Sequence, residues 1–218
     1  MPLDAVCLRA VINELDKEVA GGRIDKIYQP DRDEIVISVR TAKGGKKLMV
    51  TAEPSAPRMH LIDAIRENPA VPPMFCMLMR KHLQGAKISK ISQPAMERMA
   101  VIELDTTDEM GVAVKRELVC ELMGKYSNII LKDENGRIID AVRRIDGDIS
   151  GKRQVLPGLF YRMPPAQEGK VDPLELDGQK LVSMLEKCED ITKKLDKWLL
   201  STLLGFSPLL CRELAFRA

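Results

Sequence analysis

The chain has 218 residues, of which 45% are hydrophobic and 30% charged, a composition that can bury a core and that excludes intrinsic disorder. The formal net charge is only +2, which excludes a global polycation, so any contact with nucleic acid must depend on local charge. No apolar run approaches the ~20 residues of a spanning helix, and no secretory signal opens the sequence, so we predict a cytoplasmic protein without a membrane partner.

The motif content argues against the common catalytic and metal chemistries. The five cysteines are scattered without a Cys-x-x-Cys pair, and only two histidines occur, which disfavours disulfides and a zinc site and favours buried free thiols. The chain also lacks a glycine-rich phosphate loop, a dinucleotide-binding fingerprint and a nucleophile elbow. We therefore predict no metal and no cofactor.

The first quarter of the chain predicts one helix followed by a β-meander. Asp4 is a suitable N-cap, and apolar residues then recur at helical spacing until Gly21 and Gly22 end the pattern. Alternating apolar residues predict strands at residues 23–29, 35–39 and 47–51, with a turn at residues 31–33.

The middle of the chain predicts a second helix and an antiparallel sheet. A proline-rich stretch leads into an apolar helix over residues 74–83, which ends in a basic turn before Gly85. Alternating patterns then predict strands at residues 88–91, 99–104, 118–122, 128–131 and 137–142.

The last quarter predicts a separate helical segment. A linker rich in proline and glycine precedes expected helices at residues 178–187, 190–204 and 209–216, the last with Ser207 as its N-cap. We predict an α+β domain over residues 1–170 and the start of a helical module over residues 171–218. Because the final helix is still apolar and periodic where the sequence stops, we expect a piece of a longer protein.

Positive charge concentrates in two stretches, residues 58–98 and 143–170, which carry excesses of four and three basic side chains. If these side chains shared a face they would attract phosphate, and the scarcity of aromatic residues favours recognition of a folded RNA by its backbone and shape. The candidates for backbone contact are Arg80, Lys81, His82, Lys87, Lys90, Arg143, Arg144, Lys152 and Arg153. The alternative is that these are ordinary solvated charges, with His82 favouring the helix dipole.

An acidic residue and an arginine stand side by side just before a predicted strand, at Glu97 and Arg98. At a loop edge the carboxylate can accept hydrogen bonds from base or hydroxyl groups, while the guanidinium can contact phosphate. The alternatives are a plain charge pair for these two residues and a plain N-cap role for Asp4.

Three long strings, at residues 22–30, 67–83 and 121–131, resemble the N-terminal NFACT domain of the RqcH/NEMF family, historically called fibronectin-binding protein A. The resemblance extends over essentially the whole chain. It implies a fold akin to the N-terminal domain of formamidopyrimidine-DNA glycosylases without their chemistry, followed by the start of a helix-hairpin-helix region.

The resemblance also implies a function in ribosome-associated quality control. Members recognise large ribosomal subunits that carry peptidyl-tRNA, and bacterial members recruit alanine tRNA and support template-free alanine tails. The ribosome forms the peptide bonds, so we expect a tRNA-delivering factor and not an enzyme. The family's tRNA-handling residues fall on Asp4, Glu97 and Arg98, with two departures: Ala5 stands where glycine is common, and Glu97 where aspartate is better known.

Two alternatives remain from other functional classes. The historical name suggests a fibronectin-binding surface adhesin, against which stand the missing secretion signal, the free thiols and the local positive charge. The Met-Pro start suggests glycosylase chemistry at Pro2, but Leu3 replaces the catalytic glutamate of those enzymes.

Overall fold

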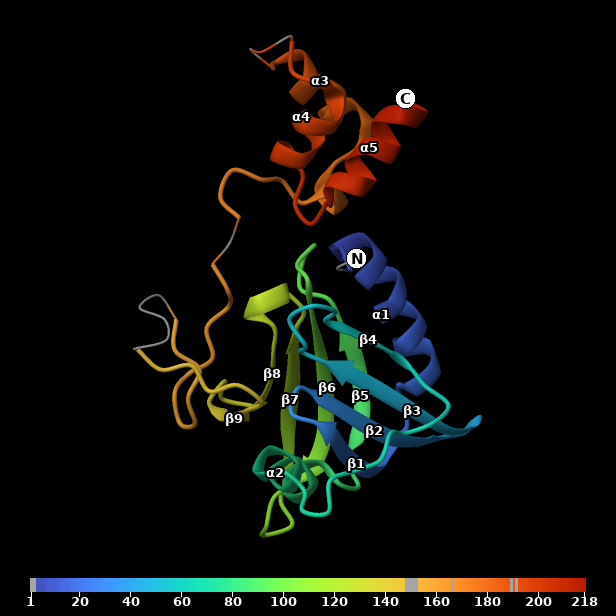
Figure 1. Ribbon diagram of the computed structural model, residues 1–218, viewed down its shortest axis with the longest axis vertical. Coiled ribbons are helices and arrows are strands. Elements are labelled where there is room, and N and C mark those ends of the chain that lie inside the picture. The colour runs from blue at the N-terminus through green and yellow to red at the C-terminus, as the bar shows by residue number, and fades with distance from the viewer. Residues whose placement is uncertain (1–2, 148–152, 166, 189, 191) are drawn as a thin grey trace.

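The computed structural model of the chain describes residues 3–147, 153–165, 167–188, 190 and 192–218 (Figure 1). An N-terminal helix and a large antiparallel sheet form one body, and the C-terminal helices form a module beside the N-terminus of the first helix. The α+β class is therefore confirmed. Among the described residues, no helix has both the length and the apolar character needed to cross a bilayer.

The first helix, α1 (Ala5–Val19), follows the predicted pattern. Asp4 caps it, since its carboxylate accepts a hydrogen bond from the backbone N–H of Cys7 at 2.8 Å. Its buried face contains Leu8, Ile12 and Leu15, while Cys7 lies on the solvent side. The expectation of buried thiols is thus wrong for Cys7 and only partly met at Cys188, which is half-buried, although the five cysteines are free as predicted.

The strands of the described residues form one nine-stranded sheet with the order β4-β3-β2-β1-β5-β6-β7-β8-β9, and every neighbouring pair is antiparallel. The strands are β1 (Arg23–Asp31), β2 (Glu34–Thr41), β3 (Gly44–Thr51), β4 (Arg58–Leu61), β5 (Lys87–Ser92), β6 (Met99–Thr107), β7 (Ala113–Glu121), β8 (Asn128–Asp133) and β9 (Ile138–Ala141). The predicted meander and the predicted middle sheet are therefore continuous. Strand β4, inside the proline-rich stretch, was not predicted.

The two faces of the sheet bury separate sets of residues because side chains alternate along each strand. Even-numbered residues of β6, such as Ile102, pack with α1 and with α2 (Met74–Leu83) in the main core. Odd-numbered residues, such as Met99, join Val155 and Tyr161 in a second cluster, where the chain after β9 covers the opposite face.

The C-terminal module has its own small core, built around Trp198, Leu203 and Cys211. Its helices are α3 (Gly178–Glu186), α4 (Leu195–Thr202) and α5 (Pro208–Arg217), and two 3₁₀ turns, η1 (Gly124–Tyr126) and η2 (Pro173–Glu175), complete the elements. Helix α4 begins five residues later than predicted, because the Asp190 carboxylate accepts hydrogen bonds from the backbone and hydroxyl of Thr192 and closes a turn there.

Candidate functional site

The predicted residues Asp4, Glu97 and Arg98 come together where α1, the β5–β6 loop and the C-terminal module meet. The link is Gln93, whose side-chain nitrogen donates to the carbonyl oxygens of Ala5 at 2.9 Å and of Glu97 at 2.8 Å. One amide therefore holds the residue after Asp4 and the residue before Arg98. The sequence alone did not indicate whether Asp4 lies near Glu97 and Arg98.

The β5–β6 loop presents Glu97 and Arg98 on a tight, fixed turn. The backbone N–H of Glu97 donates to the carbonyl of Pro94 at 3.2 Å, and Ala95 between them adopts a left-handed conformation with φ of 47°. On the other side of the pair, the carbonyl of Arg98 accepts from the N–H of Leu122 at 2.8 Å. Both flanks of the pair are thus anchored by the backbone.

Asp4 joins the N-termini of two helices. One carboxylate oxygen caps α1, and the other accepts a hydrogen bond from the Ser207 hydroxyl at 2.7 Å. The Ser207 oxygen in turn caps α5 by accepting from the N–H of Leu210 at 3.2 Å. Asp4 is therefore an N-cap, as its simpler interpretation held, and also a contact to the module.

The module approaches α1 closely at Gly205. The N–H of Ala5 donates to the Gly205 carbonyl at 3.2 Å, and Gly205 has a φ of 77°. A Cβ atom at this position would lie 2.7 Å from the Cβ of Ala5 and would overlap the carbonyl oxygen of Met96. Only glycine satisfies both the conformation and the contact.

Burial and two nearby charges, those of Arg98 and Asp172, act on the Glu97 carboxyl in this site. Burial raises the pKa of Glu97, the neighbouring Arg98 partly offsets this effect, and the charge of Asp172 raises the pKa further. Asp172 caps η2 in the module and was not predicted as a site residue, because nothing in the sequence relates it to Glu97. The group can accept hydrogen bonds from amino and hydroxyl groups and offers Arg98 to an anion.

The basic end of α2 lies at the other end of β6 from this site (Figure 1). Arg80 uses its Nε to donate to the carbonyl of Ile27 at 2.8 Å. Lys81 is exposed and forms an ion pair with Glu109 at 2.5 Å. These cations are therefore partly committed within the protein.

His82, Lys87 and Lys90 are the remaining candidates of the first basic stretch. Burial, with the nearby charges of Arg116 and Lys81, lowers the pKa of His82, so its imidazole is neutral at pH 7 and unsuited to holding phosphate by charge. Lys87 and Lys90 are exposed along β5. Of these three residues, only the two lysines offer charge to solvent at neutral pH.

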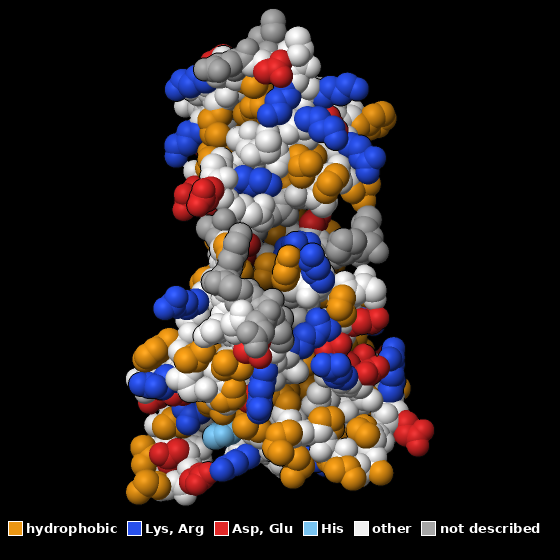
Figure 2. All heavy atoms as spheres, turned by 60° about the vertical axis from the view of Figure 1, so that its left-hand side comes forward, with side chains coloured by type: hydrophobic (Ala, Val, Ile, Leu, Met, Phe, Trp, Pro, Cys, Tyr) orange, Lys and Arg blue, Asp and Glu red, His pale blue; other side chains and the backbone are white. Residues whose placement is uncertain are grey.

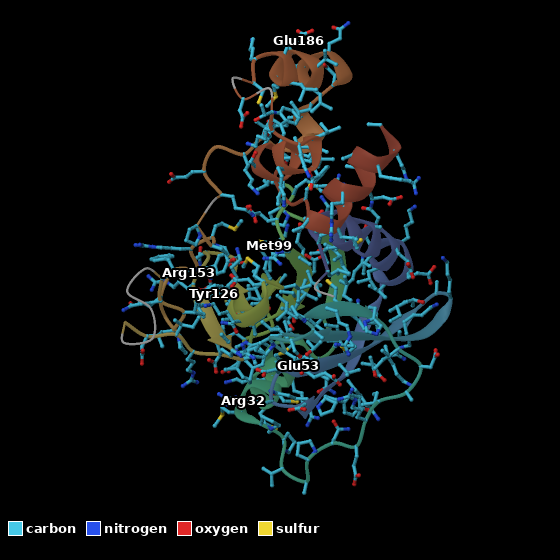
Figure 3. The ribbon with its side chains drawn as sticks, turned by 45° about the horizontal axis from the view of Figure 1, so that its top comes forward. Arg32, Glu53, Met99, Tyr126, Arg153 and Glu186 are labelled. Atoms are coloured by element: carbon cyan, nitrogen blue, oxygen red, sulfur yellow. The ribbon has the colours of Figure 1, made fainter. Side chains whose placement is uncertain are left out.

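Three arginines of the second basic stretch are paired with carboxylates, each through two nitrogens. The pairs are Arg143 with Asp33, Arg144 with Asp140 and Arg153 with Glu121. In Figure 3, Arg153 lies on the opposite side of Met99 from α1 and α5, away from the Asp4 site. Lys152 lies outside the described residues.

In the view of Figure 2, lysine and arginine side chains are distributed along the molecule among acidic and hydrophobic ones. The backbone candidates of the described residues lie on three separate parts of the chain, the end of α2, strand β5 and the segment after β9. The structure therefore brings Asp4, Glu97 and Arg98 into one site and leaves the backbone candidates dispersed.

Comparisons with known proteins agree on the family. The family model of NFACT N-terminal and middle domains matches residues 4–218. The Rqc2 homolog RqcH of Bacillus subtilis is 37% identical over 219 aligned positions, which cover 100% of this chain and 38% of that relative. Ribosome quality control complex subunit 2 of Saccharomyces cerevisiae is 27% identical over 66% of this chain and 13% of its own length.

A solved structure shares the fold. The crystal structure of the N-terminal domain of the fibronectin-binding protein PavA from Streptococcus pneumoniae superposes with a TM-score of 0.91 and 31% identity, covering 99% of this chain and 79% of that one. The chain thus spans well under half the length of the curated relatives, but most of this domain structure.

Proposed function

This chain belongs to the family of NFACT N-terminal and middle domains, whose relatives include ribosome quality control factors, and we propose that it binds tRNA in that process. In the whole protein, the tRNA would be alanine tRNA, and the partner would be the large ribosomal subunit with peptidyl-tRNA. The product would be a template-free C-terminal alanine tail. The ribosome would form the peptide bonds in the cytoplasm, so this chain would position tRNA and catalyse no reaction.

The observation that carries the proposal is that the Gln93 side chain donates to the carbonyl oxygens of both Ala5 and Glu97, which places Asp4 near the Glu97–Arg98 pair. In this proposal the two carboxylates accept hydrogen bonds from base amino groups or ribose hydroxyls, and Arg98 contacts phosphate. Glu97 is one methylene longer than the aspartate of better-known members, but its backbone is fixed by the turn at Pro94, which supports a defined reach for its carboxylate.

Two finer features of the fold belong to the same proposal. We expect the sheet and α1 to resemble the N-terminal domain of formamidopyrimidine-DNA glycosylases, and the C-terminal module to open a helix-hairpin-helix region. Glycosylase chemistry is not proposed, because Leu3 stands in the place of the catalytic glutamate and Pro2 lies outside the described residues.

The test is equilibrium binding of the chain to alanine tRNA, an unrelated tRNA and duplex DNA across a salt series. The variants are Arg98→Ala and the double variant Glu97→Ala, Arg98→Ala. Arg40→Ala is the matched control, because Arg40 is exposed and its ion pair with Asp25 is long, at 4.0 Å. We expect a preference for alanine tRNA that falls about tenfold in both variants, with an unchanged melting temperature and an unaltered control.

Equal binding to the three nucleic acids, insensitive to the variants, would contradict a tRNA-specific site in this chain. Binding to immobilised fibronectin without binding to tRNA would instead support the adhesin interpretation, which the name of the PavA structure keeps in view.

A further inference from the structure

A groove of about 750 Å³ lies between the end of β1, the N-terminus of α2 and β9. Its walls are mainly apolar and include Pro30, Pro69, Pro73, Phe75, Ala141 and Val142. Helix α2, which lines the groove, lies far from the N-terminus of α1 in Figure 1, and the groove shares no residue with the proposed tRNA site, which therefore does not account for it. Its volume falls in the range of pockets that bind peptides or other small ligands.

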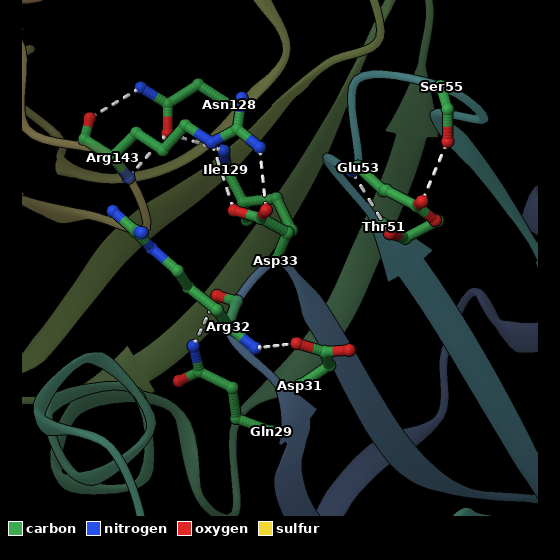
Figure 4. A network of polar contacts seen from close by, with 10 residues as sticks. All are labelled: Gln29, Asp31, Arg32, Asp33, Thr51, Glu53, Ser55, Asn128, Ile129 and Arg143. Atoms are coloured by element: carbon green, nitrogen blue, oxygen red, sulfur yellow. Dashed lines mark hydrogen bonds and ion pairs between the residues drawn. The ribbon is translucent and has the colours of Figure 1, made fainter.

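A buried acceptor lacks a partner in this groove. Gln29 is only 5% exposed, and its side-chain nitrogen donates to the carbonyl of Arg32 at 2.9 Å. Its side-chain oxygen has no hydrogen-bond partner among the described residues and is directed toward the side on which α2 lies (Figure 4). A buried acceptor without a donor is costly, so a ligand N–H at this point would be favoured.

Donors and a positive charge face the same groove. Pro73 stands at the N-cap position of α2 and no side chain caps this helix, so the first-turn N–H groups remain available to an acceptor. Arg32 is exposed, and its guanidinium has no ion pair in the described part of the chain. Arg144, by contrast, is already paired with Asp140.

The rim of the groove favours apolar side chains over nucleotides. Met74, which lines the groove at the start of α2, is 73% exposed. Flexible methionines of this kind adapt to apolar partner side chains. The one aromatic ring that lines the groove, Phe75, is too buried to stack with a base.

We propose that this groove binds an extended peptide of a partner protein, with apolar side chains and a carboxylate. The apolar side chains pack against the proline walls and Met74, a peptide N–H donates to Gln29, and the carboxylate is held by Arg32 and the first-turn N–H groups of α2. In this binding mode, the main-chain polar groups of the peptide and its C-terminal or side-chain carboxylate all have hydrogen-bond partners in the groove.

The test uses fluorescein-labelled octapeptides with leucine or phenylalanine at alternate positions, serine between them, and either a free or an amidated C-terminus. Fluorescence anisotropy compares the parent chain with Arg32→Glu and Met74→Glu, two exposed positions where folding should be preserved. Arg40→Glu and Met110→Glu are matched controls, since both residues are exposed and lie outside the groove. A single-stranded RNA dodecamer is the competing probe.

We expect the free-carboxylate peptides to bind and the amidated ones to bind about tenfold more weakly. Each groove variant should lose about tenfold in affinity for the free-carboxylate peptides, whereas the two controls should not change. Absence of peptide binding at about 1 mM, or equal binding by groove and control variants, would overturn the proposal. RNA binding that is lost in the groove variants, with no peptide binding, would overturn it in favour of a nucleotide site.

Discussion

At the scale of single residues, Glu97 has the clearest physical signature in the proposed tRNA site. Its carboxyl is drawn into the junction between the β5–β6 loop and the module, and burial together with Asp172 raises its pKa despite Arg98. The folded state therefore binds a proton at Glu97 more tightly than the unfolded chain does. At neutral pH the charged Glu97 carboxylate therefore lowers the stability of the folded state. Such a cost is typical of residues that serve in binding.

The first prediction is that Glu97→Gln stabilises the chain at neutral pH. Because the folded pKa is raised, the contribution of Glu97 to stability is present below the unfolded value of about 4.3 and is lost as the pH rises through the folded value. Glutamine stays neutral, so its advantage should grow from pH 4 to pH 7, as calorimetric melting temperatures will show. Glu14→Gln, at an exposed position of α1, should show no such trend, and a pH-independent difference would contradict the assignment.

The site could be predicted in part from single residues. The sequence identified Asp4 and Ser207 as N-caps, because capping depends on local neighbours, and the structure confirms both. It did not identify Gln93, because the atoms that this amide holds are backbone carbonyls, which any residue at those positions would present. It also did not reveal Asp172, whose contribution depends on how the module sits against the loop.

At the scale of elements, the predictions succeeded where a pattern was long and regular. Helix α2 has the predicted bounds, because four buried residues recur on one face over ten positions. Strand β4 was missed because it has four residues between prolines, too few for alternation to be recognised. Its pairing with β3 supplies the stabilisation that its own sequence does not show.

The second prediction concerns the docking of the module, which Gly205 controls. Gly205→Ala adds a methyl group that overlaps Met96 and Ala5, in addition to placing a side chain on a residue with positive φ. We expect a loss of about 2 kcal/mol or more in urea unfolding. Hydrogen exchange of the first turns of α1 and α5 should also accelerate, because the Asp4–Ser207 bond is released.

Gly169→Ala is the control for this effect. Gly169 has the same φ of 77°, but a Cβ there meets no atom within 4 Å. It should therefore show the conformational cost alone, about 1 kcal/mol, without faster exchange at α1. Equal losses of stability and equal exchange rates in Gly205→Ala and Gly169→Ala would show that glycine is not needed at position 205 for the close contact with α1.

At the scale of the whole molecule, the two halves of the sheet are joined where β1 and β5 begin, by backbone hydrogen bonds that include Ile24 N–H to the Ala86 carbonyl at 2.8 Å and Ile88 N–H to the Gly22 carbonyl at 2.9 Å. β1 and β5 share one paired position, Arg23 with Lys87. A second connection runs from the β1–β2 turn to the end of β9, where Arg143 binds Asp33 through two nitrogens, at 3.0 and 2.7 Å (Figure 4). The buried Asn128 fixes the backbone of Arg143 by bonding both its N–H and its carbonyl.

This second connection could not be predicted, because it depends on residues 110 positions apart. The sequence assigned Arg143 to RNA backbone contact on the basis of its charge and its neighbours. The structure shows that its guanidinium already has a carboxylate partner, so a phosphate would have to compete with Asp33. The role of such an arginine is decided by the packing of the sheet and not by the local density of charge.

The third prediction is that the Arg143–Asp33 pair stabilises the contact between the β1–β2 turn and the segment after β9, measured by a double-mutant cycle with Arg143→Met and Asp33→Asn in urea unfolding. Both side chains are 21% exposed and the pair is bidentate, so we expect a coupling energy of about 1–2 kcal/mol. The same cycle on Arg40 and Asp25, an exposed pair at 4.0 Å, should give a coupling near zero. Equal couplings would contradict a stabilising role for this pair, since α1, α2 and the backbone hydrogen bonds near Arg23 also connect the two halves.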